Sequence, residues 1–114
     1  MPQFLILPLE TRGTFAKYGR AEMRAIVKRY SHWTRALARR GCLINGDRII
    51  DGRLLQTSRG KVVARKASQK EATPGGYWLV RAKTLKAALQ LCQDCPHFEF
   101  GALRVLQIEG NREA

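Results

Sequence analysis

The sequence has few of the features that mark membrane, secreted or disulfide-stabilised proteins. Its opening apolar run covers only Phe4 to Leu7, and no later run approaches the roughly 18 residues that span a bilayer. No basic residue precedes that run and Pro8 follows it, so it predicts a first strand and not a signal peptide. The 3 cysteines are an odd number and are too sparse for a disulfide framework. We therefore expect a cytoplasmic protein with reduced thiols and no membrane association.

Acidic residues are also scarce. Asp and Glu number 9 against 21 Lys and Arg, which gives a formal net charge of +12 and favours polyanionic partners. A hydrophobic fraction of 45% with 26% charged residues is still typical of a globular chain, and 114 residues suit one domain. We assign residues 1–109 to a single domain and residues 110–114 to a mobile C-terminal tail.

Hydrophobic periodicity predicts an alternation of strands and helices. We expect strands at residues 3–9, 76–82 and 102–108. Residues 42–44 and 48–56 are short apolar or alternating stretches broken by the turn dipeptides Asn45-Gly46 and Asp51-Gly52, and residues 53–65 predict a hairpin around Ser58-Arg59-Gly60. A first helix is expected over residues 21–40, with apolar positions at Met23, Ile26, Val27, Tyr30, Trp33 and Leu37. A second helix starts after Thr84 and stops at Pro96.

This order predicts an α+β fold, specifically a ferredoxin-like βαββαβ sandwich with an extra hairpin. Two helices would cover one face of an antiparallel sheet. The other face would expose more apolar area than monomers usually show, so we expect a second copy or a ligand to cover it.

The first predicted helix carries a basic stripe opposite its apolar face. Its members recur at helical spacing: Arg24, Lys28, Ser31, Arg35 and Arg39. A solvated surface accounts for such a stripe, because one face of any surface helix is polar. The alternative is contact with the phosphate backbone of a nucleic acid.

The segment LCQDCPHFEF, residues 91–100, resembles a metal or redox site. Redox Cys-x-x-Cys pairs work from a helix N-terminus, where amide dipoles stabilise the thiolate. Cys92 and Cys95 instead fall in the last predicted helical turn, on its inward side, so we expect buried, unreactive thiols and no metal or cofactor. His32 is expected on the exposed side of the first helix.

Several motifs together resemble the DGPF-type branch of the YCII-related family over nearly the whole chain. They are Glu22-Met23 followed by Tyr30-Ser31-His32-Trp33, then Gly75-Gly76-Tyr77, and Cys95-Pro96-His97 before the last strand. The resemblance implies a ferredoxin-like domain that pairs through its sheet into a homodimeric α/β barrel. It also implies an accessory or regulatory role, since relatives of the branch are often encoded beside extracytoplasmic-function sigma factors.

The chain departs from the branch at two places. Between Val63 and Lys70 it has only Ala-Arg-Lys-Ala-Ser-Gln, which is shorter than the Asp-Gly-Pro-Phe loop region and has no acid. The last strand reads Arg104-Val105-Leu106-Gln107, where the branch usually has Glu-Val-Arg-Pro. The His and Asp suggested as a catalytic dyad in the wider family have no assignable counterpart, so efficient catalysis is not expected.

Two classes of function follow. The first is a dimeric small-ligand-binding or accessory protein, with a small anionic ligand and with pocket candidates at Tyr77, Trp78, His97, Glu99 and Arg104. His97 and Glu99 would share a face there if their segment were extended. The alternative is nucleic-acid binding, because RNA-recognition motifs share the βαββαβ plan and a Gly-aromatic strand such as Gly76-Tyr77-Trp78.

Overall fold

Strand β1, Gln3–Glu10, is the centre of an antiparallel sheet in the computed structural model, which describes residues 1–110. It pairs with β6, Gly76–Arg81, on one side and with β7, Leu103–Ile108, on the other. The outer edge beside β6 is β2, Leu43–Arg48. The short β5, Thr73–Pro74, pairs with the last residues of β1, so the far end of β1 is held from both sides.

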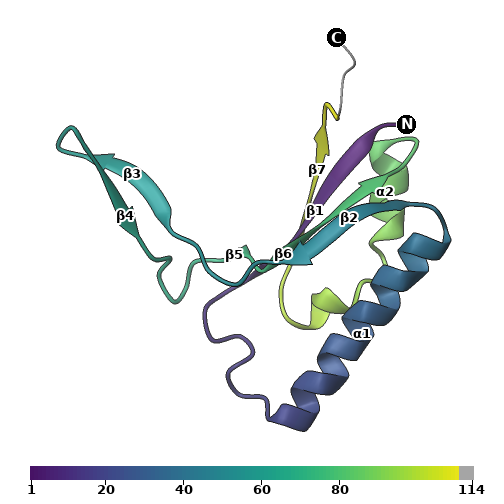
Figure 1. Ribbon diagram of the computed structural model, residues 1–114, viewed down its shortest axis with the longest axis horizontal. Coiled ribbons are helices and arrows are strands. Elements are labelled where there is room, and N and C mark those ends of the chain that lie inside the picture. Colours follow the sequence, from purple (N-terminus) through teal and green to yellow (C-terminus); the bar gives the residue numbers. More distant parts are fainter. Residues whose placement is uncertain (111–114) are drawn as a thin grey trace.

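Both helices lie on one side of this sheet (Figure 1). They are α1, Arg20–Arg39, and α2, Leu85–Leu91, and a 3₁₀ turn, η1, Pro96–Glu99, follows on the same side. Alternate strand residues point toward the helices, as the pleat requires. The core consists mainly of Phe4, Ile6, Trp33, Leu37, Trp78, Val80, Ala88 and Leu91.

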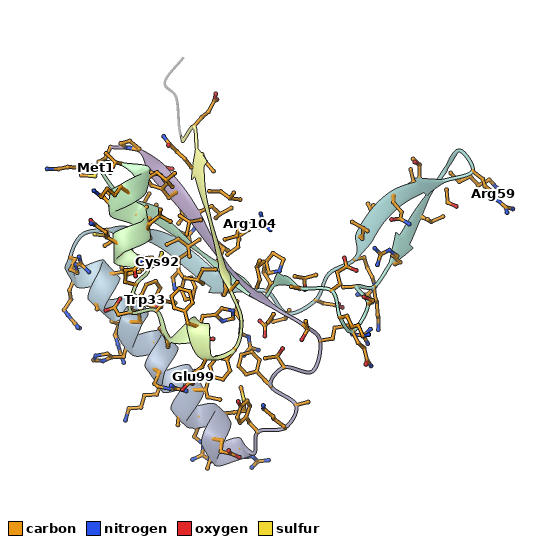
Figure 2. All side chains as sticks on the ribbon, turned by 180° about the vertical axis from the view of Figure 1, so that it is seen from behind. Met1, Trp33, Arg59, Cys92, Glu99 and Arg104 are labelled. Carbon is orange, nitrogen blue, oxygen red and sulfur yellow. The ribbon has the colours of Figure 1, made fainter. Side chains whose placement is uncertain are left out.

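The opposite sheet face has no described element over it. The register places Leu5 beside Leu79 and Leu106 on this face, and Leu106 is 40% exposed. Figure 2 shows Arg104 on the side of β7 away from the helices. An aliphatic surface therefore stays open to solvent in the single chain.

Strands β3, Leu54–Ser58, and β4, Lys61–Arg65, form a hairpin that projects from the body, here called the arm (Figure 1). Its two-residue turn needs positive φ at Arg59 (53°) and Gly60 (80°). Every strand residue of the arm is exposed, including Leu55 at 67% and Val62 at 68%. The arm explains a radius of gyration of 16.1 Å, against about 13 Å for a compact chain of this length.

The α+β class, the first helix and the hairpin are confirmed, while two local predictions are wrong. Asn45-Gly46 does not break the chain but continues β2 through a register shift, with Gly46 close to the backbone carbonyl of Tyr77. The second helix ends at Leu91 and not near Pro96. The predicted tail lies outside the described residues beyond Gly110.

Within residues 1–110 no helix is both long enough and apolar enough to cross a membrane.

Candidate functional site

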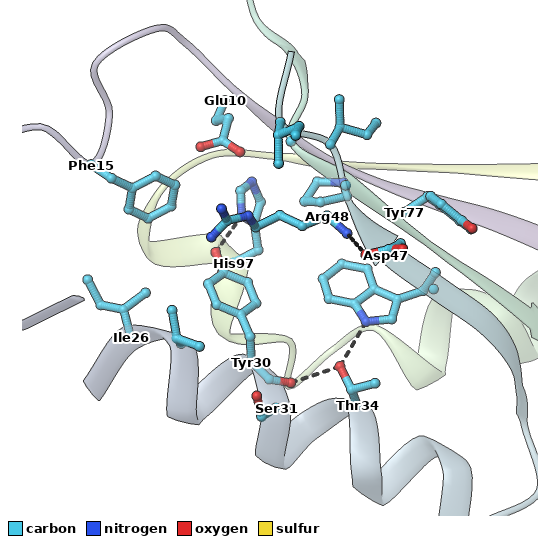
Figure 3. A pocket seen from close by; sticks show the side chains of 18 of the residues that line it. Glu10, Phe15, Ile26, Tyr30, Ser31, Thr34, Asp47, Arg48, Tyr77 and His97 are labelled. Carbon is cyan, nitrogen blue, oxygen red and sulfur yellow. Dashed lines mark hydrogen bonds between the residues drawn. The ribbon is translucent and has the colours of Figure 1, made fainter. Parts of the chain in front are cut away.

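A cavity of about 810 Å³ opens between α1 and the end of the sheet where β1, β2 and β6 meet (Figure 3). Helix α1 supplies one wall through its apolar residues Met23, Ile26 and Val27. The loop after β1 adds Phe15, whose ring meets that of Phe100 at a tilt, with the centroids 5.0 Å apart. The volume and the mainly apolar wall suit a small organic molecule.

A hydrogen-bonded chain forms the back of the cavity. The His97 ring lies 2.8 Å from the Leu9 carbonyl through Nε2 and 2.8 Å from the Tyr30 hydroxyl through Nδ1. A carbonyl oxygen only accepts, so Nε2 must carry the proton and Nδ1 must be the acceptor. The Tyr30 hydroxyl therefore donates its proton to His97.

Burial keeps this pair neutral. His97 is 1% exposed, and desolvation lowers its pKa while the Leu9 hydrogen bond partly opposes that shift. Desolvation also raises the pKa of Tyr30, and the nearby carboxyl group of Glu10 adds to the effect. Neither ring is poised to exchange a proton near neutral pH, because each charged form would be buried.

Glu10, the last residue of β1, points into the same cavity (Figure 3). Its carboxyl group fits because Gly75 has no side chain: a Cβ there would overlap the Glu10 carboxyl oxygen. Burial raises the pKa of Glu10, and the positive charge of Arg48 partly opposes the rise. Within residues 1–110 this carboxyl group has no hydrogen bond or ion pair.

Arg48, the last residue of β2, extends its guanidinium group over the cavity (Figure 3). Asp47 does not neutralise it through an ion pair, because the Asp47 carboxylate accepts a bond from the Arg48 backbone N–H at 2.8 Å. No hydrogen bond or ion pair joins the guanidinium to another residue of the described part of the chain. Its five N–H donors are therefore available to an acceptor in the cavity.

The indole ring of Trp78 forms part of the cavity floor. Its Nε1–H donates to the Thr34 hydroxyl at 2.9 Å, and that hydroxyl donates to the Tyr30 carbonyl at 2.8 Å. Trp78 also meets Trp33 edge-on with ring centroids 5.0 Å apart. These contacts fix the indole orientation, since both its polar atom and its faces have partners.

The structure brings three of the five predicted pocket residues to the cavity: Tyr77, Trp78 and His97. Tyr77 lies at the edge of the cavity, because its phenol ring points away from it (Figure 3). Its hydroxyl group donates to Asn45 Oδ1 at 3.4 Å. Glu99 lies outside and pairs with Arg29 at 2.7 Å. The extended geometry that would place it beside His97 does not occur, since both lie in η1. Arg104 lies on the open sheet face.

The basic stripe divides between two environments. Arg24, Lys28 and Arg39 are exposed on α1 and do not line the cavity, whereas Ser31 and Arg35 do. All five positions are exposed, and the cavity opens beside two of them. His32 is exposed, as predicted.

The Cys-x-x-Cys segment caps the core. Cys92 and Cys95 are 3% and 4% exposed, on the inward side as expected, although they follow the end of α2 instead of lying within it. Burial raises the pKa of Cys92 to about 12 and that of Cys95 to about 11. Such thiols hold little thiolate at neutral pH. No group of His, Cys, Asp and Glu among residues 1–110 is arranged to hold a metal ion.

Sequence reasoning missed three cavity residues: Glu10, Tyr30 and Arg48. Each ends a strand or lies on the apolar helix face, where the pattern indicates structure and not a site. One usable signal was the pair Gly75-Gly76 beside an acid-ended strand, because adjacent glycines leave room for a side chain from a neighbour.

A YCII-related domain model matches residues 5–110. The chain belongs to the YCII-related domain family. No curated protein matches the sequence. The YCII-related match begins within β1 and covers every later strand and helix described above, including the arm and all residues that carry the cavity.

Proposed function

We propose that this YCII-related protein binds a small anionic organic molecule in the cavity between α1 and the sheet. The observation that carries the proposal is the Arg48 guanidinium, which faces the cavity without a hydrogen bond to any described residue. An arginine with free donors matches a carboxylate or a similar planar anion, which it can hold by two parallel bonds. The apolar wall from Met23, Ile26 and Phe15 suits a hydrophobic body.

The two ring groups at the back of the cavity favour binding over proton transfer. General acid-base catalysis needs a group whose pKa lies near the working pH and whose proton can reach the ligand. His97 has both ring nitrogens engaged, with Leu9 and Tyr30, and Tyr30 has a raised pKa. These two rings therefore orient a ligand and do not move its protons.

Calorimetric titration with phenylacetate tests this proposal. We expect saturable binding to the unmodified protein and at least a tenfold loss in Arg48→Gln, because the anion loses its charge-assisted bonds. Arg39→Gln is the matched control: it removes one charge from an exposed position on α1 outside the cavity. Equal losses in both variants would mean that the overall charge of +12 attracts the anion and would refute a site at Arg48.

We further propose a ferredoxin-like domain of the DGPF-type branch that pairs through its open sheet face into a dimeric α/β barrel. The strand order β2-β6-β1, with β7 on the free side of β1, supports the domain type. The aliphatic face with Leu5, Leu79 and Leu106 supports pairing, since a second copy would remove this surface from water. Light-scattering mass tests it, and a monomer at micromolar concentration would contradict it.

A nucleic-acid interface has weaker physical grounds. RNA-recognition motifs stack bases on aromatic residues of the open sheet face. Here Phe4 and Trp78 point into the core, and Tyr77 is the aromatic residue that the described strands offer on the open side. The basic positions Arg24, Lys28 and Arg39 remain for non-specific phosphate contacts.

A further inference from the structure

Two polar residues of the cavity differ in the hydrogen-bonding groups that they offer a ligand. Arg48 provides only hydrogen-bond donors, whereas Tyr30, at the base of the cavity, provides only an acceptor. This follows from the chain of bonds behind Tyr30: the Leu9 carbonyl requires the proton on His97 Nε2, so Nδ1 takes the Tyr30 hydroxyl proton. The lone pair that remains on the Tyr30 oxygen is the part available to a ligand.

We infer that the ligand is a hydroxylated organic acid, whose anionic group binds Arg48 and whose hydroxyl group donates to Tyr30. The inference rests on the proposed anion-binding function of the cavity. Glu10, Arg48 and Tyr30 all line the same cavity, so one small molecule that enters it can meet both proposed contacts. An acid without a donor would leave the free lone pair of the Tyr30 oxygen without a partner in the occupied cavity, and that costs affinity.

A hydroxyl group can donate to Tyr30 without bringing a further charge into a cavity whose lining already holds two guanidinium groups, of Arg35 and Arg48, and two carboxyl groups, of Glu10 and Asp47. A carbonyl group would not serve, because it only accepts and so meets the Tyr30 lone pair without a proton between them.

Calorimetric titration with each enantiomer of mandelate and with phenylacetate, which lacks only the hydroxyl group, tests the inference. We expect at least one mandelate enantiomer to bind about fivefold more tightly than phenylacetate, the effect of one well-placed hydrogen bond. In Tyr30→Phe the preference for mandelate should be lost, so that the two acids bind equally. Phenylacetate binding as tightly as both enantiomers would overturn the inference and leave the proposed function standing. Binding of none of the three would remove both.

A second measurement does not depend on a variant. The chain has 2 histidines, and His32 is exposed, so it serves as an internal reference. Nitrogen NMR of the histidine-labelled protein should show His97 with the proton on Nε2 and an unprotonated Nδ1. A proton on Nδ1 would make Tyr30 the acceptor from His97 and free its hydroxyl to donate, which would overturn the inference even if Tyr30→Phe failed to fold.

Discussion

At the scale of single residues, Glu10 sets the charge of the cavity. Its carboxyl group occupies the space that Gly75 leaves, and burial raises its pKa above that of an exposed glutamate. When it is ionised, its negative charge partly neutralises Arg48, the residue proposed to bind the anion. The protonation state of this half-buried carboxyl group therefore changes how strongly the cavity attracts an anion.

This gives a prediction for the dependence of affinity on pH. Because protonation removes the negative charge beside Arg48, affinity for benzenesulfonate should rise as the pH falls through the raised pKa of Glu10. Benzenesulfonate stays ionised throughout, so the ligand does not titrate. Glu10→Gln should bind more tightly than the unmodified protein at pH 7 and should show no such rise.

The Glu10→Gln variant separates Glu10 from the other groups that line the cavity. The pKa of Tyr30 is raised, so Tyr30 does not change charge in the acidic range. His97 has a lowered pKa, and Asp47 also lines the cavity, but both residues are unchanged in Glu10→Gln. A rise of equal size in that variant would therefore contradict the role given to Glu10.

Residue roles were the part least predictable from the sequence. Trp78 and His97 were found because aromatic and titratable residues near strands suggest a site. Glu10 and Arg48 end their strands, and only the three-dimensional meeting of β1, β2 and β6 brings them together. Glu99 shows the reverse error, since a 3₁₀ turn and not a strand directs it to Arg29.

At the scale of elements, the turn η1 connects the core to the cavity. Its His97 reaches the Leu9 carbonyl of β1, and the Gly101 amide donates back to the His97 carbonyl at 3.1 Å. Gly101 lies so close to β1 that a Cβ would overlap the Leu9 carbonyl oxygen. A side chain at this position would push η1 away from β1.

Gly101→Ala should therefore destabilise the protein by about 1–3 kcal/mol, the usual cost of overpacking. The reason is that backbone atoms of β1, and not a flexible side chain, occupy the space. Gly52→Ala is the matched control, because a Cβ at Gly52 meets nothing within 4 Å. Urea unfolding monitored by circular dichroism measures both, and similar midpoints for the two variants would show that η1 can move without cost.

Elements were easier to predict than residues because periodicity reports burial directly. The long first helix and strand β6 were confirmed, since their apolar residues recur at 3.6 and 2 positions respectively. The sequence places the end of α2 too late, because a proline commonly ends a helix and Pro96 is the first proline after Thr84. The chain instead leaves the helix after Leu91 and buries Cys92 and Cys95. Strand β2 continues through Gly46 because this glycine lies against the backbone carbonyl of Tyr77. That contact joins two strands far apart in the sequence, so the local pattern does not reveal it.

At the scale of the whole molecule, two apolar surfaces have no element of residues 1–110 over them. One is the open sheet face, and the other is the arm, which leaves the body on the side of the sheet away from the helices (Figure 1). One face of the arm is uncharged and consists of Leu55, Thr57, Val62 and Ala64. An isolated two-stranded hairpin is only marginally stable in water, so a second copy seated on the sheet would stabilise the arm as well.

The double substitution Leu55→Ser with Val62→Ser should weaken the proposed dimer by at least tenfold, because it makes the uncharged face polar. Sedimentation of a dilution series measures the dissociation constant. Gln56→Ser with Ser58→Ala, on the other face of the arm, is the control and should leave the constant unchanged. A dimer that tolerates both pairs of substitutions would show that the sheet alone holds the copies together.

The two tryptophans of the chain lie in edge contact, yet they report on different places. Trp78 lines the cavity, whereas Trp33 donates to the Asp94 carboxylate at 3.0 Å, beside the segment that links α2 to η1. The tryptophan fluorescence of the protein therefore reports on both places in one signal. A molecule that enters the cavity changes the surroundings of one indole, and loosening of the α2–η1 link changes the other, so the protein carries a built-in fluorescent probe that requires no label.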